Sequence, residues 1–129
     1  MDGVIISKIE PMPGSTPIKT TFLIGVLPGQ VEEMFCIRVK GFTSCHVHGG
    51  KDKSKKPETV RVIMGRVRFT FQSIATNNTE SCIVDGGTTI TIDPLIIHKT
   101  EVLEDAVIVE PRVTRFNKDA ADTRYPQIV

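Results

Sequence analysis

Three histidines and one glutamate are the residues of this sequence best suited to do chemistry together. His46 and His48 are separated by one residue within a run typical of a β-strand, and Glu58 and His98 follow further along the chain. Alternate residues of a strand share one face, so both rings of the pair point to one side, about 6–7 Å apart along the backbone. Imidazole nitrogens and one carboxylate suit a divalent Zn, Fe, Mn, Ni or Co ion. We therefore predict a metal site at His46, His48, Glu58 and His98.

The position of Glu58 supports this prediction. By strand parity it lies on the same side as Val60, Val62 and Met64, which we expect to face a core. A carboxylate that points into a core is costly unless it is paired or bound to something. We predict that Glu58 is a metal ligand and a candidate catalytic group, because Glu58 or a bound water could move a proton.

The elements that position these residues are predicted to be strands. Runs rich in Val, Ile, Thr and Phe alternate with turn signals such as Pro28-Gly29, and no segment has a sustained helical period. Many short strands at regular spacing predict a sandwich or barrel, with a tight reversal at Gly65. The predicted strands are Val4–Ile9, Thr20–Leu27, Glu33–Val39, Thr59–Met64, Arg66–Phe71, Ser81–Val84, Thr88–Ile92, Ile96–Thr100 and Ala106–Glu110. In the fifth of these, Val67, Phe69 and Phe71 are expected to face the core.

Length, charge and cysteine content limit the classes of function. The 129 residues suit one domain, 1–129, with a barrel core over about 40–110 and a tail over 112–129. The net charge of +1 does not indicate a nucleic-acid partner or a membrane surface, and no apolar run is long enough to span a membrane. The start has no signal-peptide pattern, and three widely spaced cysteines favour reduced thiols. These features predict a cytoplasmic protein.

The residues around the first three predicted ligands resemble the first sequence motif of the cupins. In that motif a Gly precedes His-x-His, and six residues separate a Glu from a second Gly. Gly41, His46, His48, Glu58 and Gly65 match this order, although the nine residues between His48 and Glu58 exceed the family's three or four. The resemblance implies an all-β cupin fold, a jelly-roll barrel also called a double-stranded β-helix.

The stretch from Gly87 to His98 resembles the second cupin motif, which contains a Pro and ends near the last ligand His. Pro94 and His98 are in place, but Ile96 replaces the usual Gly and Val102 stands where an Asn is expected. The resemblance covers roughly residues 40–110. It implies that His98 lies beside the ligands of the first motif.

The tail carries a further resemblance. The segment from Arg115 to Pro126 is similar to the closing segment of some cupins of nucleotide-sugar and capsular-polysaccharide pathways. It implies a carbohydrate substrate that Tyr125 would contact. The alternative is that Phe116 and Tyr125 only pack against the barrel.

The loop from Gly49 to Pro57 is polar and basic and is predicted to be mobile. It is either a solvated connector or a flap that attracts an anionic substrate to the barrel mouth. For the second case we predict that Lys51 and Lys53 bind a small-molecule substrate. Cys45 points away from the ligands by parity and is not expected to be a nucleophile.

Three functions remain open at this point. The first is isomerase- or epimerase-like action on a sugar or nucleotide-sugar, although the chain has no Trp and only one Tyr to form a sugar platform. The second is a metal-dependent dioxygenase of a small organic substrate, whose dry pocket would need apolar walls. The third is a non-catalytic module that binds a small ligand. The apolar walls expected for the second are Val60, Val62, Val67, Phe69, Ile90 and Ile92.

The assembly is predicted to be a homodimer. The apolar runs Val4–Ile9 and Thr20–Leu27 would be exposed unless they packed against the edge of another sheet. A second copy of the chain would provide that edge.

Overall fold

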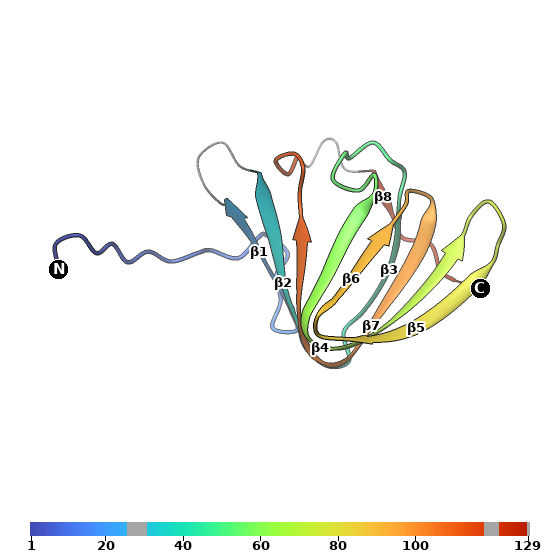
Figure 1. The fold of residues 1–129 in the computed structure, drawn as a ribbon, viewed down its shortest axis with the longest axis horizontal. Helices are drawn as coiled ribbons and strands as arrows, with labels where there is room; N and C mark the ends of the chain where they lie inside the picture. Colours follow the sequence, from blue (N-terminus) through green and yellow to red (C-terminus); the bar gives the residue numbers. More distant parts are fainter. Residues whose placement is uncertain (26–30, 118–121, 129) are drawn as a thin grey trace.

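The computed structural model is a strongly curled antiparallel sheet that forms a half-barrel, shown in Figure 1. It describes residues 1–25, 31–117 and 122–128, and within these ranges there is no helix. Consequently no helix in these ranges has the length and apolarity needed to cross a membrane. The strands are β1 (Lys19–Gly25), β2 (Glu32–Arg38), β3 (Thr43–His48), β4 (Glu58–Ser73), β5 (Thr79–Asp85), β6 (Thr88–Ile92), β7 (Ile96–Pro111) and β8 (Thr123–Arg124). The predicted all-β fold is confirmed.

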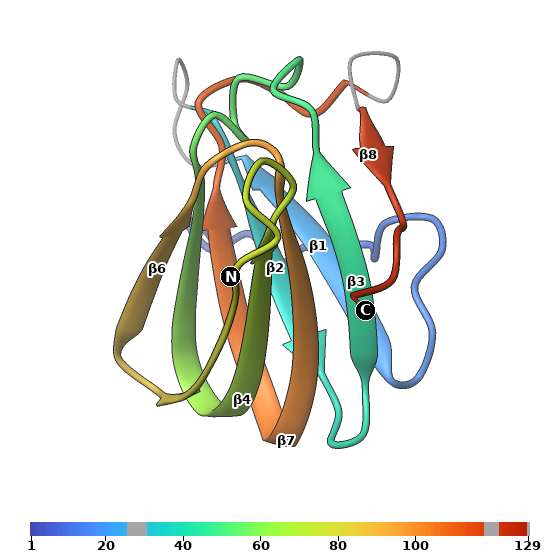
Figure 2. The same ribbon diagram turned by 90° about the vertical axis from the view of Figure 1, so that its right-hand side faces the viewer.

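Two long strands organise the sheet. β4 and β7 have 16 residues each and pair with one another along most of their length. The main path of the sheet runs β1-β2-β7-β3-β8, while β5 and β6 pair with β4. Figure 2 shows the short β8 beside β3, which brings the end of the described chain next to its middle. Because β7 borders β2, β3 and β4, it connects the two sides of the half-barrel.

The predicted tight reversal at Gly65 is wrong, because β4 continues through this residue. The pairing with β7 shifts register around it, which is the mark of a bulge or a local irregularity. Gly65 has a φ of +99°, and a Cβ on it would collide with the backbone of Asp105 and Ala106. Glycine therefore lets β4 bend while it stays in contact with β7. The two strands predicted over 96–110 are likewise one continuous strand, β7.

The bend in β4 changes which residues face the core. Before it, Glu58 and Val62 are buried; after it, Val67 and Phe69 are, so the inward parity moves from even to odd numbers. The expected core face of Val67, Phe69 and Phe71 is confirmed. Met64, predicted to point inward, is 58% exposed because it lies where the register shifts. The core cluster consists of Cys36, Val60, Val62, Val67, Phe69, Ile92, Val102, Ala106 and Ile108.

The N-terminal segment does not form the predicted strand over Val4–Ile9. It is extended but pairs with no described strand, and Ile5 and Ile6 are more than nine-tenths exposed. Strand propensity alone does not order a segment that lacks a partner. The next predicted strand is present as β1, while its expected end at Leu27 and the turn at Pro28-Gly29 lie outside the described residues.

Candidate metal centre

Three strands bring the four predicted ligands together at one end of the half-barrel. His46 and His48 lie on β3 with one residue between them, and His98 on β7 is the cross-strand partner of His46. Glu58 is the first residue of β4 and is only 2% exposed. The ligand atoms all lie within 4.8 Å of one another. The structure thus brings together the four residues that the sequence predicted as ligands.

The spacing of the ligand atoms suits one metal ion. The Nε2 atoms of His46 and His98 are 2.8 Å apart, and Oε2 of Glu58 lies 3.2 Å from Nε2 of His48 and 3.3 Å from Nε2 of His98. Two ligand atoms at right angles, each about 2.1 Å from an ion, are separated by about 3.0 Å. The three measured distances are close to this value.

Two orphaned atoms give independent support for a cation. Nε2 of His48 and Oε2 of Glu58 are buried and have no hydrogen-bond partner in the described part of the chain, although they face each other. Buried polar atoms without a partner are rare and costly. A cation between the imidazoles and the carboxylate would satisfy both atoms, so the residues present fit a divalent metal.

The outer ring nitrogens of two histidines are held by other groups. Nδ1 of His98 lies 3.1 Å from the carbonyl oxygen of Ile96 and must donate, because a carbonyl only accepts. In the neutral ring this leaves Nε2 unprotonated and available to a metal. Nδ1 of His48 lies 3.1 Å from Oγ1 of Thr123 on β8. Such contacts fix the orientation of ligand rings.

Thr123 is a site residue that sequence reasoning missed. β8 pairs with β3, and the register places Thr123 opposite His48. The available signal was the Asp-Thr pair, Asp122-Thr123, within the tail segment that resembles the closing segment of some cupins. The tail is therefore part of the site, although its strand pattern is weak.

The electrostatics of the cluster favour a neutral His46 ring and a charged Glu58 carboxylate. Burial, together with the neighbouring His98, lowers the pKa of His46 to about 3. Burial alone would raise the pKa of Glu58, but its contacts with Glu110, His48 and His98 and the charge of Lys55 outweigh it and hold that pKa well below its ordinary value. Burial alone would lower the pKa of His98, yet its contact with the Glu58 carboxylate raises it. A metal must therefore compete with a proton at His98.

Lys55 is a second residue that the sequence did not single out as part of the site. Its Nζ lies 3.1 Å from Oε1 of Glu58 and 3.4 Å from Oε1 of Glu110, and its side chain is 10% exposed. Burial raises the pKa of Glu110 to about 7, with the charge of Lys55 acting against the rise. The Lys55 ammonium thus links the carboxyl groups of Glu58 and Glu110.

The loop that carries Lys55 is packed against the barrel, so the expectation of a mobile, solvated connector is wrong at these positions. Asp52 and Ser54 are buried, and the carboxylate of Asp52 accepts two hydrogen bonds of 3.1 Å from Nη2 of Arg112. The hydroxyl of Ser54 accepts from the backbone N–H of Val113 at 3.0 Å. The buried residues of this loop are polar, so the sequence contains no apolar pattern that would have predicted their burial.

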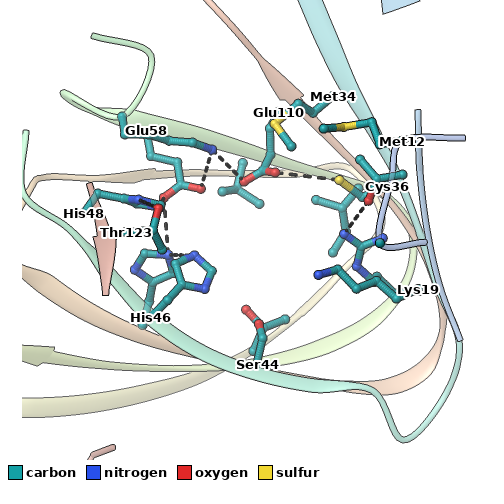
Figure 3. Close-up of a pocket in the computed structure, with 18 of the residues that line it drawn as sticks. Met12, Lys19, Met34, Cys36, Ser44, His46, His48, Glu58, Glu110 and Thr123 are labelled. Carbon is teal, nitrogen blue, oxygen red and sulfur yellow. Dashed lines mark hydrogen bonds and ion pairs between the residues drawn. The ribbon is translucent and has the colours of Figure 1, made fainter. Parts of the chain in front are cut away.

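A cavity of about 310 Å³ opens onto the ligand cluster, and Figure 3 shows its walls. Tyr125 and Phe116 line it, although Tyr125 is 78% exposed, so the alternatives of substrate contact and packing against the barrel both stay open for this residue. Lys51 and Lys53, predicted to bind substrate, are exposed and are not among the lining residues. Their role and that of Tyr125 remain predictions.

The cavity walls carry more charge than the sequence suggested. Of the six apolar residues expected to form a dry pocket, only Val60 and Phe69 line the cavity. The charged and polar lining side chains are Ser15, Lys19, Thr21, Arg38, Ser44, Asp52, Lys55, Thr100, Glu110, Arg112, Thr123 and Tyr125, besides the four ligands. Apolar side chains such as Met34, Phe42 and Ile108 form other parts of the wall, so the cavity combines both kinds of surface.

Neither a known protein-family model nor a curated protein sequence matches the chain. Solved structures do. The capsular polysaccharide assembling protein CapF from Staphylococcus aureus matches with a TM-score of 0.73 and 18% identity, over 93% of this chain and 32% of that one. An oxalate decarboxylase from Lactobacillus farciminis in a formate complex matches with a TM-score of 0.68 and 13% identity, over 91% of this chain and 33% of that one. This chain thus spans about a third of either protein. Both contain cupin barrels, which confirms the fold that the motifs implied.

Proposed function

We propose that this metal-binding cupin acts on a sugar, free or linked to a nucleotide, by moving a proton at a carbon next to a carbonyl group. The observation that carries the proposal is the cavity that opens directly onto His46, His48, Glu58 and His98, with charged and polar side chains set among its apolar ones. A substrate with several hydroxyl groups would find hydrogen-bond partners on these side chains, and its carbon face would meet the apolar ones. Further support comes from the similarity to CapF, a capsular polysaccharide assembling protein.

The roles of the residues follow from their contacts. The three histidines and Glu58 would hold a divalent ion, which when bound supplies a Lewis acid for a carbonyl or hydroxyl oxygen. Lys55 would fix the orientation of Glu58 through the 3.1 Å contact to its Oε1. Glu58 remains the predicted proton carrier, and Glu110 is a second carboxyl group in the same cavity. Proton removal and return leave the composition of the sugar unchanged, as in an isomerase or epimerase.

The identity of the metal is proposed from the ligand set and one comparison. Zn, Fe, Mn, Ni and Co all accept imidazole and carboxylate ligands. A further matching structure concerns the Mn(II) centres of Bacillus subtilis oxalate decarboxylase, at 13% identity and a TM-score of 0.66. Manganese is therefore the first ion to test.

The experiment is hydrogen exchange in D₂O. Protein loaded with manganese, and separately with zinc, is incubated with reducing sugars and nucleotide-linked keto sugars, and proton NMR follows the C–H signal next to the carbonyl. We expect exchange with metal-loaded protein and with the Cys45→Ala variant, but none with chelator-treated protein or with His48→Ala.

The same samples separate the alternatives. Oxygen uptake with a small organic acid, without exchange on any sugar, would favour the dioxygenase. Saturable ligand binding with neither exchange nor oxygen uptake would favour a non-catalytic module. Either result would overturn the proposal.

We also propose a cytoplasmic location. The three cysteines, Cys36, Cys45 and Cys82, are all free thiols in the structure. Free thiols are typical of a reducing compartment.

A further inference from the structure

The cavity contains two cations that no carboxylate neutralises. Its four cationic lining residues are Lys19, Arg38, Lys55 and Arg112. Lys55 and Arg112 form the ion pairs described above. Within the described ranges, Arg38 and Lys19 have no ion-pair partner. Since the lining residues include three carboxylates, positive charge is in excess even before a divalent ion is bound.

Arg38 is buried on β2 and is surrounded by neutral groups. The residue is 9% exposed, and its Nη1 donates to the carbonyl oxygens of Thr20 at 3.0 Å and Ile37 at 3.1 Å. Its Nη2 donates to Oγ1 of Thr21 at 2.9 Å, and its guanidinium carbon lies 5.2 Å from the centre of the Phe42 ring. These contacts hold the guanidinium in place but leave its charge uncompensated, which is costly for a buried cation.

The guanidinium also has donors to spare. The contacts above use both hydrogens of Nη1 and one of Nη2, so Nε–H and the second Nη2 hydrogen have no acceptor in the described part of the chain. A carboxylate or phosphate is the group that an arginine with free donors recognises best. Arg38 is therefore built to accept an anionic group from the cavity.

Lys19 lies near the same part of the cavity and is exposed. Figure 3 places it, with Cys36, across the cavity from His46, His48 and Glu58. A ligand that reaches from one side to the other would therefore meet the metal ligands at one end and cations at the other.

We propose that Arg38, assisted by Lys19, binds the carboxylate or phosphate group of an acidic sugar derivative whose reacting carbon lies at the metal centre. This inference rests on the proposed function and names the substrate class of the same site. The volume of about 310 Å³ is at the lower end of the range for small-molecule sites. A compact sugar acid or sugar phosphate fits such a cavity, and a nucleotide part would lie outside it.

The first test is calorimetric titration of chelator-treated protein with glucuronate, glucose 6-phosphate and neutral glucose. We expect at least one acidic sugar to bind about tenfold or more tightly than glucose, because of its charge-assisted hydrogen bonds. The tighter of the two identifies a carboxylate or a phosphate as the recognised group. Arg38→Gln should abolish this preference, whereas Arg68→Gln, a matched change of a half-exposed arginine on β4, should preserve it.

A second variant and a second measurement do not depend on how well Arg38→Gln folds. Lys19→Gln changes an exposed side chain and should lower the affinity for the acidic sugar by a factor of about two to five, as expected for a cation at the edge of a site. NMR of the wild-type protein should show the Arg38 Nε–H signal shifting with the same ligand. Equal binding of glucose and both acids, or an unmoved Arg38 signal at saturation, would refute the inference.

These results are separable from the test of the proposed function. If an acidic sugar binds at Arg38 without metal but metal-loaded protein exchanges no proton, the proposed reaction fails and the anion site stands. If metal-loaded protein exchanges protons on acidic sugars no better than on neutral ones, and Arg38→Gln does so equally well, the reaction stands and the anion site fails.

Discussion

Replacing Lys55 with methionine tests how the site balances its charges. The Lys55 ammonium lies between Glu58 and Glu110, at 3.1 and 3.4 Å, and side-chain exposure at the three residues is 10%, 2% and 17%. Methionine keeps the apolar stem and removes the charge. In metal-free protein, Glu58 then lacks its main cationic partner. In metal-loaded protein, the divalent ion compensates the same carboxylate.

The size of the effect follows from the burial of the pair. Removing one partner of a buried ion pair costs about 3–5 kcal/mol, because the other charge is left uncompensated. For a chain of this length that loss lowers the melting temperature by roughly 10–20 °C. We therefore expect Lys55→Met to melt far below the wild type in chelator and to recover most of the difference with manganese or zinc.

The assay is thermal unfolding with and without metal, and Lys51→Met is the control. Lys51 lies on the same loop but is exposed, so its replacement should change the melting temperature by little. The reasoning is refuted if metal-free Lys55→Met has the same melting temperature as metal-free Lys51→Met. It is refuted equally if metal raises the melting temperature of Lys55→Met no more than that of the wild type.

Three further outcomes are expected. Thr123→Val should weaken metal binding about 10- to 100-fold in a chelator competition, because it removes the partner of a ligand ring, and an unchanged affinity would contradict that role. Without metal, the free energy of unfolding should be nearly level from pH 6.5 to 4.5. In that window His46, whose pKa in the fold is about 3, lowers the free energy of unfolding as the pH falls, because only the unfolded chain takes up its proton. Glu110, whose pKa in the fold is about 7, raises the free energy of unfolding, because only the folded chain takes up its proton. Each effect amounts to about 1.4 kcal/mol per pH unit, so the two cancel. Below pH 4.5 the unfolded chain takes up protons at Glu58 that the folded chain does not, so stability should fall steeply, whereas a steady fall from pH 6.5 in chemical denaturation would argue against this balance. Light scattering should give twice the 14.2 kDa chain mass, and deleting residues 1–10, whose apolar side chains are exposed and which precede the edge strand β1, should give the monomer. A monomeric full chain would rule the dimer out.

The ligand cluster was predictable because its signal is local. Parity on a single strand settles the sidedness of His46 and His48, and burial of Glu58 follows from its neighbours Val60 and Val62. None of these inferences needs to know which strands are adjacent. His98 required one long-range assumption, which the second motif supplied and the pairing of β3 with β7 bears out.

The residues that complete the site were not predictable in the same way. Lys55 lies in a loop whose composition is typical of a solvated connector, and only the positions of Glu58 and Glu110 explain its burial. Thr123 is distant in sequence from His48, so its role depends on the pairing of β8 with β3. At Gly65 the sequence allowed both a reversal and a bend, and the close approach of β7 decides between them.

The charge arrangement gives the cavity a direction. At one side lie a carboxylate and three imidazoles, where Nε2 of His48 and Oε2 of Glu58 have no hydrogen-bond partner among the described residues. At the other side, Arg38, the cross-strand partner of Lys19, retains positive charge and unused donors. Lys55 pairs with Glu58 of the ligand cluster and with Glu110. A ligand with an anionic end and a neutral, oxygen-rich end would therefore bind in one orientation, because its reversal would place the anionic group away from Arg38 and leave those donors unsatisfied.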